Sequence, residues 1–253
     1  MNFIKTTLED GVATLTLANP PLNILTRAVL GELRQALIAL AEAPDLRVLL
    51  IVGEGKHFSA GADVGEHLPP THRELIPEFM ATLGTLAASP LPTIAAVRGR
   101  CLGAGFELVQ ACDMIVAGEG ATFGQPEIQL AVTAPVACVL LPRRTTYGHA
   151  AEILFGGEAI DAKRALAIGV VQHVVPDPRT EEHALALAGR CAKHSATALR
   201  ATKHTLLETA DQPRAASFQK AGQIYVHELM SASDPVEGLE AFLARRTPSW
   251  RHR

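Results

Sequence analysis

Two glutamates in apolar surroundings are the side chains of this sequence best suited to acid–base chemistry. Glu107 stands between a phenylalanine and a leucine, and Glu127 lies between a proline and an isoleucine. Burial among such neighbours raises the pKa of a carboxyl group, and two carboxyl groups of this kind can divide the roles of acid and base. A buried ion pair with Arg98 or Arg100 is the alternative, because structural ion pairs also shift pKa values.

Small residues follow two of the expected strands and form a second candidate feature. The segments are residues 58–63, Phe-Ser-Ala-Gly-Ala-Asp, and residues 99–107, which contain Gly103 and Ala104. Without bulky side chains, the backbone there can approach a ligand closely. Ala104 is expected at a helix N-terminus, where free N–H groups favour negative charge. One N–H group from each segment would form an oxyanion hole, and ordinary tight turns are the alternative.

Several familiar motifs are missing from the sequence. Glycines at positions 103 and 105 open an expected helix, but Leu108 stands where a dinucleotide-binding fingerprint needs its third glycine. Residues 53–56 lack the spacing of a phosphate-binding loop, and no nucleophile elbow of the Gly-x-Ser-x-Gly type is present. The ten histidines show no metal-ligand spacing. We therefore expect neither a metal nor a separate cofactor.

Composition narrows the class of protein further. The 253 residues are 48% hydrophobic, 19% charged and 4% aromatic, with a formal net charge of −3. These values predict a globular chain of one or two domains and argue against a nucleic-acid-binding surface. The four cysteines are widely spaced, the first ten residues are polar, and no apolar run approaches the ~20 residues of a membrane span. We expect a cytoplasmic enzyme without a membrane partner.

The elements that must position these groups alternate between strand and helix over roughly the first half of the chain. Expected strands occupy residues 3–8, 12–17, 48–52, 93–97 and 114–117. Asp10-Gly11 predicts a hairpin between the first two, and Thr26 is expected to cap a helix that runs to about residue 41. Residues 66–75 predict a loop, and residues 77–88 predict a helix. The alternation favours an α/β core with a largely parallel sheet.

The last third of the sequence is expected to be mostly helical. Asp161 is predicted to cap a helix that ends before Gly169, and residues 170–175 predict a further strand. Asp234, followed by a proline and then by Glu237, has the pattern of an N-cap with its partner three residues later. A helix-rich end of this kind can form a lid, a packing layer or an oligomer surface.

The sequence resembles the crotonase (enoyl-CoA hydratase/isomerase) superfamily along nearly its whole length. The matching segments occur in the family's order: Asn19-Pro20 with Asn23 and Leu25, residues 58–63, 97–107, Cys112-Asp113, residues 123–127, Asp234, Glu237-Gly238, Ala241-Phe242 and Arg246. The resemblance implies an α/β fold of the crotonase type, with a spiral core of ββα turns over residues 1–195. Residues 196–253 would be a helical region of the same unit, through which the chain assembles as a homotrimer or a dimer of trimers.

The same resemblance implies an acyl-CoA thioester substrate, with coenzyme A as part of the substrate and not as a cofactor. Backbone N–H groups of Ala62 and Ala104 would form the oxyanion hole. Glu107 would activate water and Glu127 would exchange the proton at carbon, as in family hydratases that keep both carboxylates. The substrate-contacting positions would be Leu22, Ala60, Gly61, Asp63, Val64, Leu102, Gly103, Pro126 and Ala131.

A finer resemblance lies downstream of Glu127. Residues 129–137 and 140–144, with Tyr225, residues 228–230 and Trp250, look like hydratases of cyclohexa-1,5-diene-1-carbonyl-CoA. The implied reaction is hydration of that thioester to 6-hydroxycyclohex-1-ene-1-carbonyl-CoA. Ala60 and Asp63 instead look like general 2-enoyl-CoA hydratases, so a general 2-enoyl-CoA hydratase or isomerase is an alternative. A non-catalytic acyl-CoA-binding oligomer partner is an alternative from another class.

Two basic positions of the family are replaced in this sequence. Pro21-Leu22 and Gly65 stand where relatives often carry cations that can face the CoA phosphates. Arg245 or Arg246 of a neighbouring subunit would then supply the phosphate contacts, with solvated surface charge as the alternative.

Overall fold

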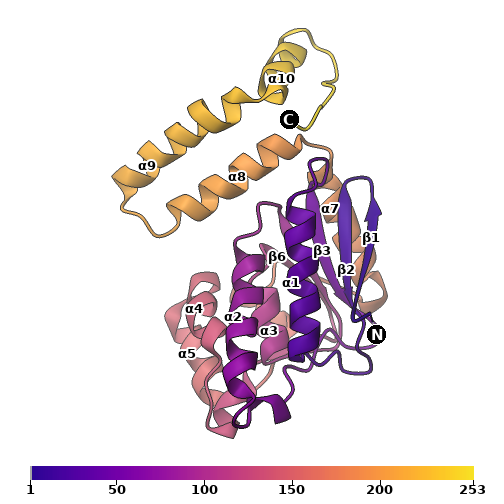
Figure 1. Ribbon diagram of the computed structural model, residues 1–253, viewed down its shortest axis with the longest axis vertical. Coiled ribbons are helices and arrows are strands. Elements are labelled where there is room, and N and C mark those ends of the chain that lie inside the picture. The colour runs from indigo at the N-terminus through magenta and orange to yellow at the C-terminus, as the bar shows by residue number, and fades with distance from the viewer. Residues whose placement is uncertain (1) are drawn as a thin grey trace.

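A six-stranded sheet forms the centre of the protein, as the computed structural model of residues 2–253 shows (Figure 1). Its strand order is β1-β2-β3-β4-β6-β9; β1 and β2 pair antiparallel, and the other neighbours pair parallel. The strands are β1 Ile4–Glu9, β2 Val12–Leu17, β3 Val48–Gly53, β4 Thr93–Val97, β6 Met114–Gly118 and β9 His173–Val175. The predicted α/β class and the predicted N-terminal hairpin are confirmed.

A small second sheet carries the segment that follows β4. Its order is β5-β7-β8, with β5 parallel to β7 and β7 antiparallel to β8. The strands are β5 Arg100–Leu102, β7 Thr122–Gly124 and β8 Ile160–Asp161. Strand β5 follows β4 after two residues and is itself followed, after Gly103, by helix α3 (Ala104–Gln110), so the glycine-rich segment lies between the small sheet and this helix.

Helices cover both faces of the main sheet. Helices α1 (Arg27–Ala41) and α2 (His72–Ala87) lie on one face, and α7 (Thr180–Ala192) lies on the other (Figure 1). Alternate residues of β3 divide between the two sides: Leu49 and Ile51 pack with α1 and α2, and their neighbours in the strand pack with α7. A strand covered on both faces is a continuous apolar run, as the sequence shows here.

Helix α1 agrees with the sequence prediction at its start and along its buried face. Thr26 Oγ1 accepts a hydrogen bond from the Val29 N–H group at 3.3 Å, which caps the first turn. The buried residues recur at helical spacing and are Val29, Leu30, Leu33, Leu37 and Leu40. Each buried large apolar side chain contributes about 1.5–3 kcal/mol, so this face, more than intrinsic propensity, holds the helix on the sheet.

The loop predicted for residues 66–75 is wrong over its second half. Helix α2 begins at His72 and runs through Pro77, which lies inside the helix. A proline there removes one backbone hydrogen bond and costs about 3 kcal/mol. Leu75 and Phe79, one turn apart on either side of the proline, are both buried. Their burial contributes about 1.5–3 kcal/mol each, and therefore outweighs the cost of the proline.

The strand predicted for residues 170–175 is also shorter than expected, since β9 begins only at the fourth of them. The first two, both valines, are buried, but their N–H groups donate to the Ala165 carbonyl at 3.0 and 3.2 Å. These two residues therefore complete the C-terminal end of helix α6 (Ala162–Ala167) and do not pair with a strand of the sheet. Both predicted ends of this helix are confirmed: Asp161 caps its start, and Gly169 follows its end with a φ of +83°.

Asp234 is not the N-cap that the sequence suggested. Helix α10 (Ser233–Leu243) already begins at the residue before Asp234, so Asp234 lies in its first turn. The carboxylate accepts hydrogen bonds from the backbone N–H groups of Arg251 at 2.8 Å and His252 at 2.9 Å. Burial raises the pKa of Asp234, but these bonds and the Ser195 hydroxyl outweigh it, so the pKa lies below its usual range. Asp234 thus holds the C-terminal segment against the helix.

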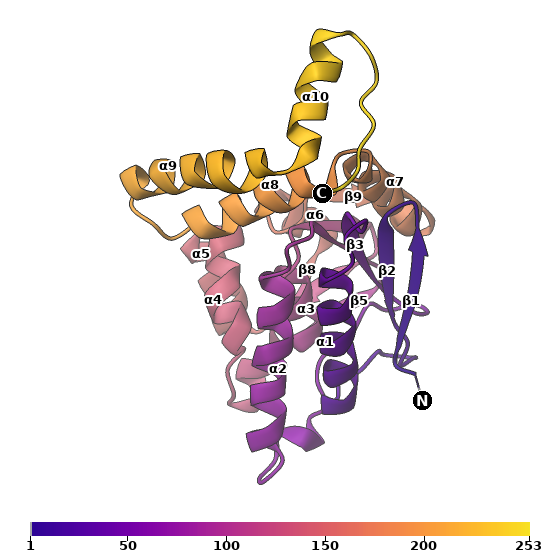
Figure 2. The same ribbon diagram turned by 45° about the horizontal axis from the view of Figure 1, so that its top comes forward.

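Residues 196–243 form a helical arm that projects beyond the sheet (Figures 1 and 2). Its helices are α8 Ala196–Thr209, α9 Arg214–Gln223 and α10, with short turns at Ile224–Glu228 and Leu229–Ser231 between the last two. Arg200 of α8 donates to the carbonyls of Ala41 at 3.0 Å and Ala43 at 2.9 Å, which joins the arm to the end of α1. Among residues 2–253, none of the helices combines the length and the apolarity that a membrane span needs.

Candidate active site

The two small-residue segments predicted from the sequence lie against each other. Short parallel bridges join Leu25 to Ala62 and Ser59 to Cys101. Gly61 has a φ of +115°, and a Cβ at this position would lie 3.3 Å from the Leu102 carbonyl oxygen. A side chain would therefore be strained here, and glycine lets the two backbones approach each other.

Ala62 and Ala104 offer backbone N–H groups at this junction. Ala104 is the first residue of α3, so its N–H group has no partner within the helix. In the described part of the chain, neither of these two N–H groups donates to an acceptor. Gly61, which precedes Ala62, lies close enough that its Cβ would stand 3.8 Å from the Ala104 nitrogen. The structure thus brings the two donors of the predicted oxyanion hole to one place.

Glu107 is held by backbone donors and not by an arginine. It is 2% exposed, and its Oε1 atom accepts from the N–H groups of Val136 at 2.8 Å and Ala137 at 2.9 Å. Both donors belong to the first turn of α4 (Pro135–Arg144), where the helix dipole also favours negative charge. Arg98 pairs with Glu181 instead. The ion-pair alternative for Glu107 is therefore wrong.

Burial controls the acidity of Glu107. Removal from water raises the pKa of its carboxyl group to about 8; the two N–H donors oppose this rise, and the charge of Glu127 adds to it. A carboxyl group with such a pKa exchanges protons near neutral pH, which is the range in which a general acid or base is effective. The contribution of Glu127 to this rise indicates that the two carboxylates lie near each other.

Glu127 lies at the start of a short turn, η2 (Pro126–Leu130), directly after the small sheet. A Cβ on Gly103 would stand 2.7 Å from Glu127 Oε1, so the carboxylate occupies the room that this glycine leaves. Burial raises its pKa, while a hydrogen bond from its own backbone N–H group and the nearby His67 partly oppose the rise. Gly103 also has a φ of +53°, which a side chain adopts at a cost. This single glycine therefore places Glu127 beside Ala104.

The remaining predicted substrate contacts fall into two groups. Leu22 joins the junction, because its carbonyl accepts from the Ala60 N–H group at 2.9 Å. Asp63 Oδ1 accepts from the Glu66 N–H group at 3.0 Å, at the start of η1 (Gly65–His67). The residues brought to the junction are Leu22, Ala60, Gly61, Leu102, Gly103 and Pro126, and the exposed residues at the ends of the two short turns are Val64 and Ala131.

Three positions that the sequence analysis did not single out as site residues support the site. Asn23, with a φ of +48°, donates through Nδ2 to the carbonyls of Glu54 at 3.0 Å and His57 at 2.8 Å, which fixes the approach to residues 58–63. Gln125 is a buried amide beside Glu127, and Gln110 is a buried amide that contacts Gln125. Arg246 makes a two-point contact with Glu237, at 2.6 and 2.8 Å. A contact between Arg245 or Arg246 and the CoA phosphates of a neighbouring subunit stays a prediction.

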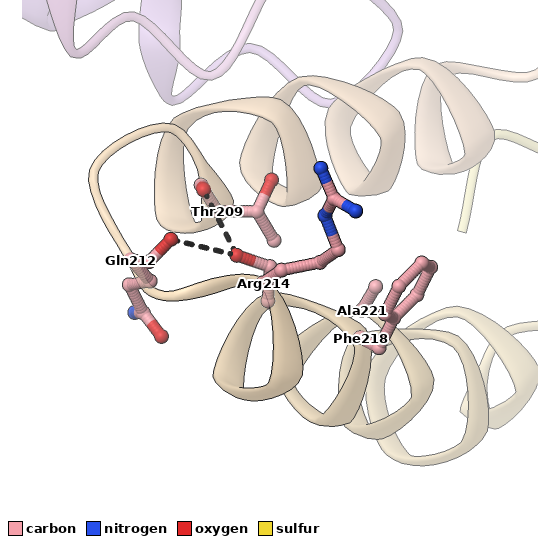
Figure 3. Close-up of a pocket in the computed structure, with 6 residues that line it drawn as sticks. Thr209, Gln212, Arg214, Phe218 and Ala221 are labelled. Atoms are coloured by element: carbon pink, nitrogen blue, oxygen red, sulfur yellow. Dashed lines mark hydrogen bonds between the residues drawn. The ribbon is translucent and has the colours of Figure 1, made fainter.

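A hollow of about 390 Å³ in the helical arm has a different chemical character (Figure 3). Its lining residues are Thr209, Gln212, Arg214, Ser217, Phe218 and Ala221. The Ser217 hydroxyl lies 3.2 Å from the carbonyl oxygens of both Thr209 and Gln212 and closes the turn between α8 and α9. The lining side chains include one cation, Arg214, and no carboxylate, so among described residues this hollow holds no acid–base pair.

Comparisons with known proteins bear on this geometry. The family model described as enoyl-CoA hydratase/isomerase matches residues 7–253. The chain is 35% identical to cyclohexa-1,5-dienecarbonyl-CoA hydratase of Thauera aromatica, over 99% of this chain and 97% of that protein. It is 36% identical to 2,3-dehydroadipyl-CoA hydratase of Escherichia coli (strain K12), over the full length of both.

Solved structures agree with the sequence relatives. An enoyl-CoA hydratase from Bacillus anthracis superposes with a TM-score of 0.94 at 31% identity and covers 99% of this chain and 100% of that one. Pseudomonas aeruginosa DspI gives a TM-score of 0.95 at 30% identity, over 99% of this chain and 97% of its own. The crotonase-type fold expected from the sequence is therefore confirmed. With a family model that spans nearly all of its length, the chain belongs to the enoyl-CoA hydratase/isomerase family and is an enzyme of the enoyl-CoA hydratase type.

Proposed function

We propose that this enzyme adds water to a carbon–carbon double bond conjugated with a CoA thioester. The observation that carries the proposal is the junction of two free N–H groups, from Ala62 and Ala104, with two carboxylates of raised pKa, the buried Glu107 and the partly buried Glu127. Donors that point at a thioester oxygen stabilise negative charge as it develops there. A base for water and an acid for carbon complete what hydration requires.

Each group has a defined task in the proposed reaction. The two N–H groups polarise the thioester carbonyl, which makes the far carbon of the double bond electrophilic. Glu107 takes a proton from water, whose oxygen forms the new carbon–oxygen bond at that carbon. The electron pair of the double bond moves toward the carbonyl, and Glu127 supplies the proton to the carbon next to it. One water is added in total, and the pair of carboxylates still holds one proton.

We propose cyclohexa-1,5-diene-1-carbonyl-CoA as the substrate and 6-hydroxycyclohex-1-ene-1-carbonyl-CoA as the product. The Thauera aromatica relative supports this choice, and so do residues 129–137 of the sequence. In this structure that segment leads into α4, whose first turn buries Val136 and holds Glu107. A pocket wall at this position would meet the ring at the carbon that receives water.

An acyclic 2-enoyl-CoA thioester is the second candidate. The similarity to the Escherichia coli enzyme, which is named for 2,3-dehydroadipyl-CoA, favours it. Both candidates use the same four groups, so the two reactions differ in the shape of the acyl pocket and not in the chemistry.

A direct comparison of substrates tests the proposal. Purified protein is mixed with cyclohexa-1,5-diene-1-carbonyl-CoA or with crotonyl-CoA, and loss of the conjugated double bond is followed by absorbance. We expect a higher kcat/KM for the cyclic thioester. Glu107→Gln and Glu127→Gln, which keep side-chain size, should each lower hydration by about 10²–10⁴-fold while CoA-ester binding persists.

Three outcomes would contradict different parts of the proposal. Turnover of crotonyl-CoA alone would exclude the cyclic substrate and favour the acyclic one. Near-wild-type hydration by either glutamine variant would exclude the two-carboxylate mechanism. Tight binding of both thioesters without turnover by the wild-type protein would favour a non-catalytic acyl-CoA-binding partner.

A further inference from the structure

Two buried amides beside the carboxylates have no part in the proposed reaction itself. Gln110, the last residue of α3, is 3% exposed, and Gln125, between β7 and η2, is 1% exposed. A buried amide carries two donors and an acceptor, and leaving them unpaired costs free energy. Their partners therefore indicate what these side chains do.

The neighbours of Gln125 fix the orientation of its amide. With Nε2 turned toward η2, it donates to Glu127 Oε2 at 3.1 Å and to the Gly103 carbonyl at 3.2 Å, and its oxygen accepts from Gln110 Nε2 at 3.1 Å. The opposite orientation would place the amide oxygen against two acceptors and the amide nitrogen against a donor. Satisfying all three contacts requires the first orientation.

Gln110 closes the network on the far side, and its own Oε1 has no hydrogen-bond partner among the described residues. Its Nε2 donates to the oxygen of Gln125, and a turned Gln125 would meet that donor with its own N–H groups. Arg144 Nε donates to the backbone carbonyl of Gln110 at 2.8 Å, which anchors the end of α3 on the end of α4. The backbone of Gln110 is thus anchored, and its side chain has one polar contact, which depends on the orientation of the Gln125 amide.

The carbonyl that Gln125 binds belongs to the same peptide group as the Ala104 N–H. The Gly103 oxygen already accepts from the Glu107 N–H group at 2.9 Å, and Gln125 adds a second donor. Donors on the oxygen of a peptide polarise its N–H group, because hydrogen bonds in a chain strengthen one another. One amide therefore contacts both the carboxylate of Glu127 and the peptide that faces the thioester oxygen.

We propose that Gln110 and Gln125 are positioning residues, which together hold the Glu127 carboxylate and the Gly103–Ala104 peptide in a fixed relation to each other. This inference rests on the proposed hydratase function, and it assigns the amides no contact with the substrate. Gln110 acts only through Gln125. Replacing Gln110 with methionine, which has similar length and no donor, should release the Gln125 amide without leaving a large cavity.

The expected consequence concerns proton binding by Glu127. A donor on Oε2 favours the ionised carboxylate, so its loss should raise the pKa of Glu127 further. The other titratable groups near this carboxylate are Glu107 from α3 and His67 from η1, and neither is altered by the change. The shift should be about one pH unit, the size expected for one hydrogen bond to a charged group.

Infrared difference spectra recorded during a pH titration measure this directly, because a protonated carboxyl group has its own carbonyl band. The band of Glu127 is the one that Glu127→Gln removes. We expect Gln110→Met to move its midpoint upward, Gln125→Met to move it at least as far, and the double variant to match Gln125→Met alone. In hydration assays, Gln110→Met should lower kcat about tenfold with little change in KM, with the acid limb of kcat/KM moved to higher pH.

A matched control separates this role from a general loss of packing. Thr82→Val removes another buried side-chain hydrogen bond, from Thr82 Oγ1 to the Leu30 carbonyl at 3.2 Å between α1 and α2. It should leave the midpoint unchanged. An unchanged midpoint in Gln110→Met, additive shifts in the double variant, or an equal shift in Thr82→Val would each overturn the inference. These infrared midpoints do not depend on turnover. Failure of the hydratase proposal would instead appear as absent hydration by the wild-type enzyme, so the two failures can be told apart.

Discussion

Glu107 combines two opposing influences on one carboxyl group. Burial favours the neutral form, and the two N–H groups at the start of α4 favour the anion. The result is a carboxyl group that exchanges its proton near neutral pH but is held in one orientation by its hydrogen bonds. A base that must face water in a fixed direction needs both properties, since rate depends on orientation as well as on acidity.

The alkaline limit of activity follows from the pKa of Glu107. The proposed reaction needs one proton shared by the pair. At neutral pH Glu107, with its pKa of about 8, holds that proton, and in the reactive form it has passed to Glu127 and left Glu107 ionised. That last proton leaves as the pH rises through about 8, so kcat/KM should fall about tenfold per pH unit above this value. Initial rates between pH 6 and 10, corrected for inactivation, would measure it. A flat profile up to pH 10 would contradict the assignment.

The sequence alone indicated both glutamates as candidate acid–base groups. It did not indicate the two amides that we propose to hold one of them. Glu107 and Glu127 are recognisable as acids among apolar neighbours. Gln110 and Gln125 look like ordinary polar residues in the sequence, because their significance lies in a contact at 3.1 Å between residues fifteen positions apart. Contacts of this kind depend on how β7 returns beside α3, and no local pattern encodes that return.

At the scale of elements, strong periodicity and capping were reliable guides. The buried face of α1 and the caps of α1 and α6 could be predicted, since both depend on local spacing. The start of α2 could not, because a proline signals a boundary and only tertiary burial of Leu75 and Phe79 overrides it. Asp234 shows the opposite error: a good capping pattern occurs in the sequence, but the carboxylate is used by the C-terminal segment.

Asp234 should therefore contribute to stability more than an exposed acid on the same helix. Asp234→Ala leaves the N–H groups of Arg251 and His252 without their acceptor, and should lower the free energy of unfolding by about 1–3 kcal/mol. Glu240→Ala, at an exposed position of α10, should change it by less than about 0.5 kcal/mol. Urea denaturation of both variants at one protein concentration measures the difference, and equal effects would refute this role.

The sign of the pH dependence at Asp234 follows from its lowered pKa. Its stabilising effect is fully present above the pKa that the group has in the unfolded chain, and it is lost as the pH falls through the lower, folded value. The gap in stability between wild type and Asp234→Ala should therefore narrow only in acid.

At the scale of the whole molecule, the helical arm exposes several large apolar side chains. Phe242 and Leu243 are 82% and 81% exposed, and Phe218 of α9 is 74% exposed. The arm projects beyond the sheet (Figure 2), and within residues 2–253 these side chains are left uncovered. Large exposed apolar patches mark interaction surfaces. We propose that the arm joins copies of this chain as a homotrimer or a dimer of trimers.

Light scattering coupled to size-exclusion chromatography tests this assembly. We expect a mass of three or six chains for the wild type and a smaller mass for the Phe242→Asp, Leu243→Asp double variant. Leu8→Asp is a suitable control, since Leu8 is 67% exposed on β1, away from the arm, and should leave the mass unchanged. A wild-type mass of one chain would refute the proposal.

The attachment of Glu107 to the first turn of α4 links two properties that an engineer would wish to vary separately. Val136 and Ala137 shape the region proposed for the acyl group, and their N–H groups also set how readily the base gives up its proton. Substitutions that widen this turn for a bulkier substrate should therefore displace the pH optimum as well. Libraries directed at residues 135–137 are best screened at several pH values, or active variants will be discarded for having the wrong acidity and not the wrong shape.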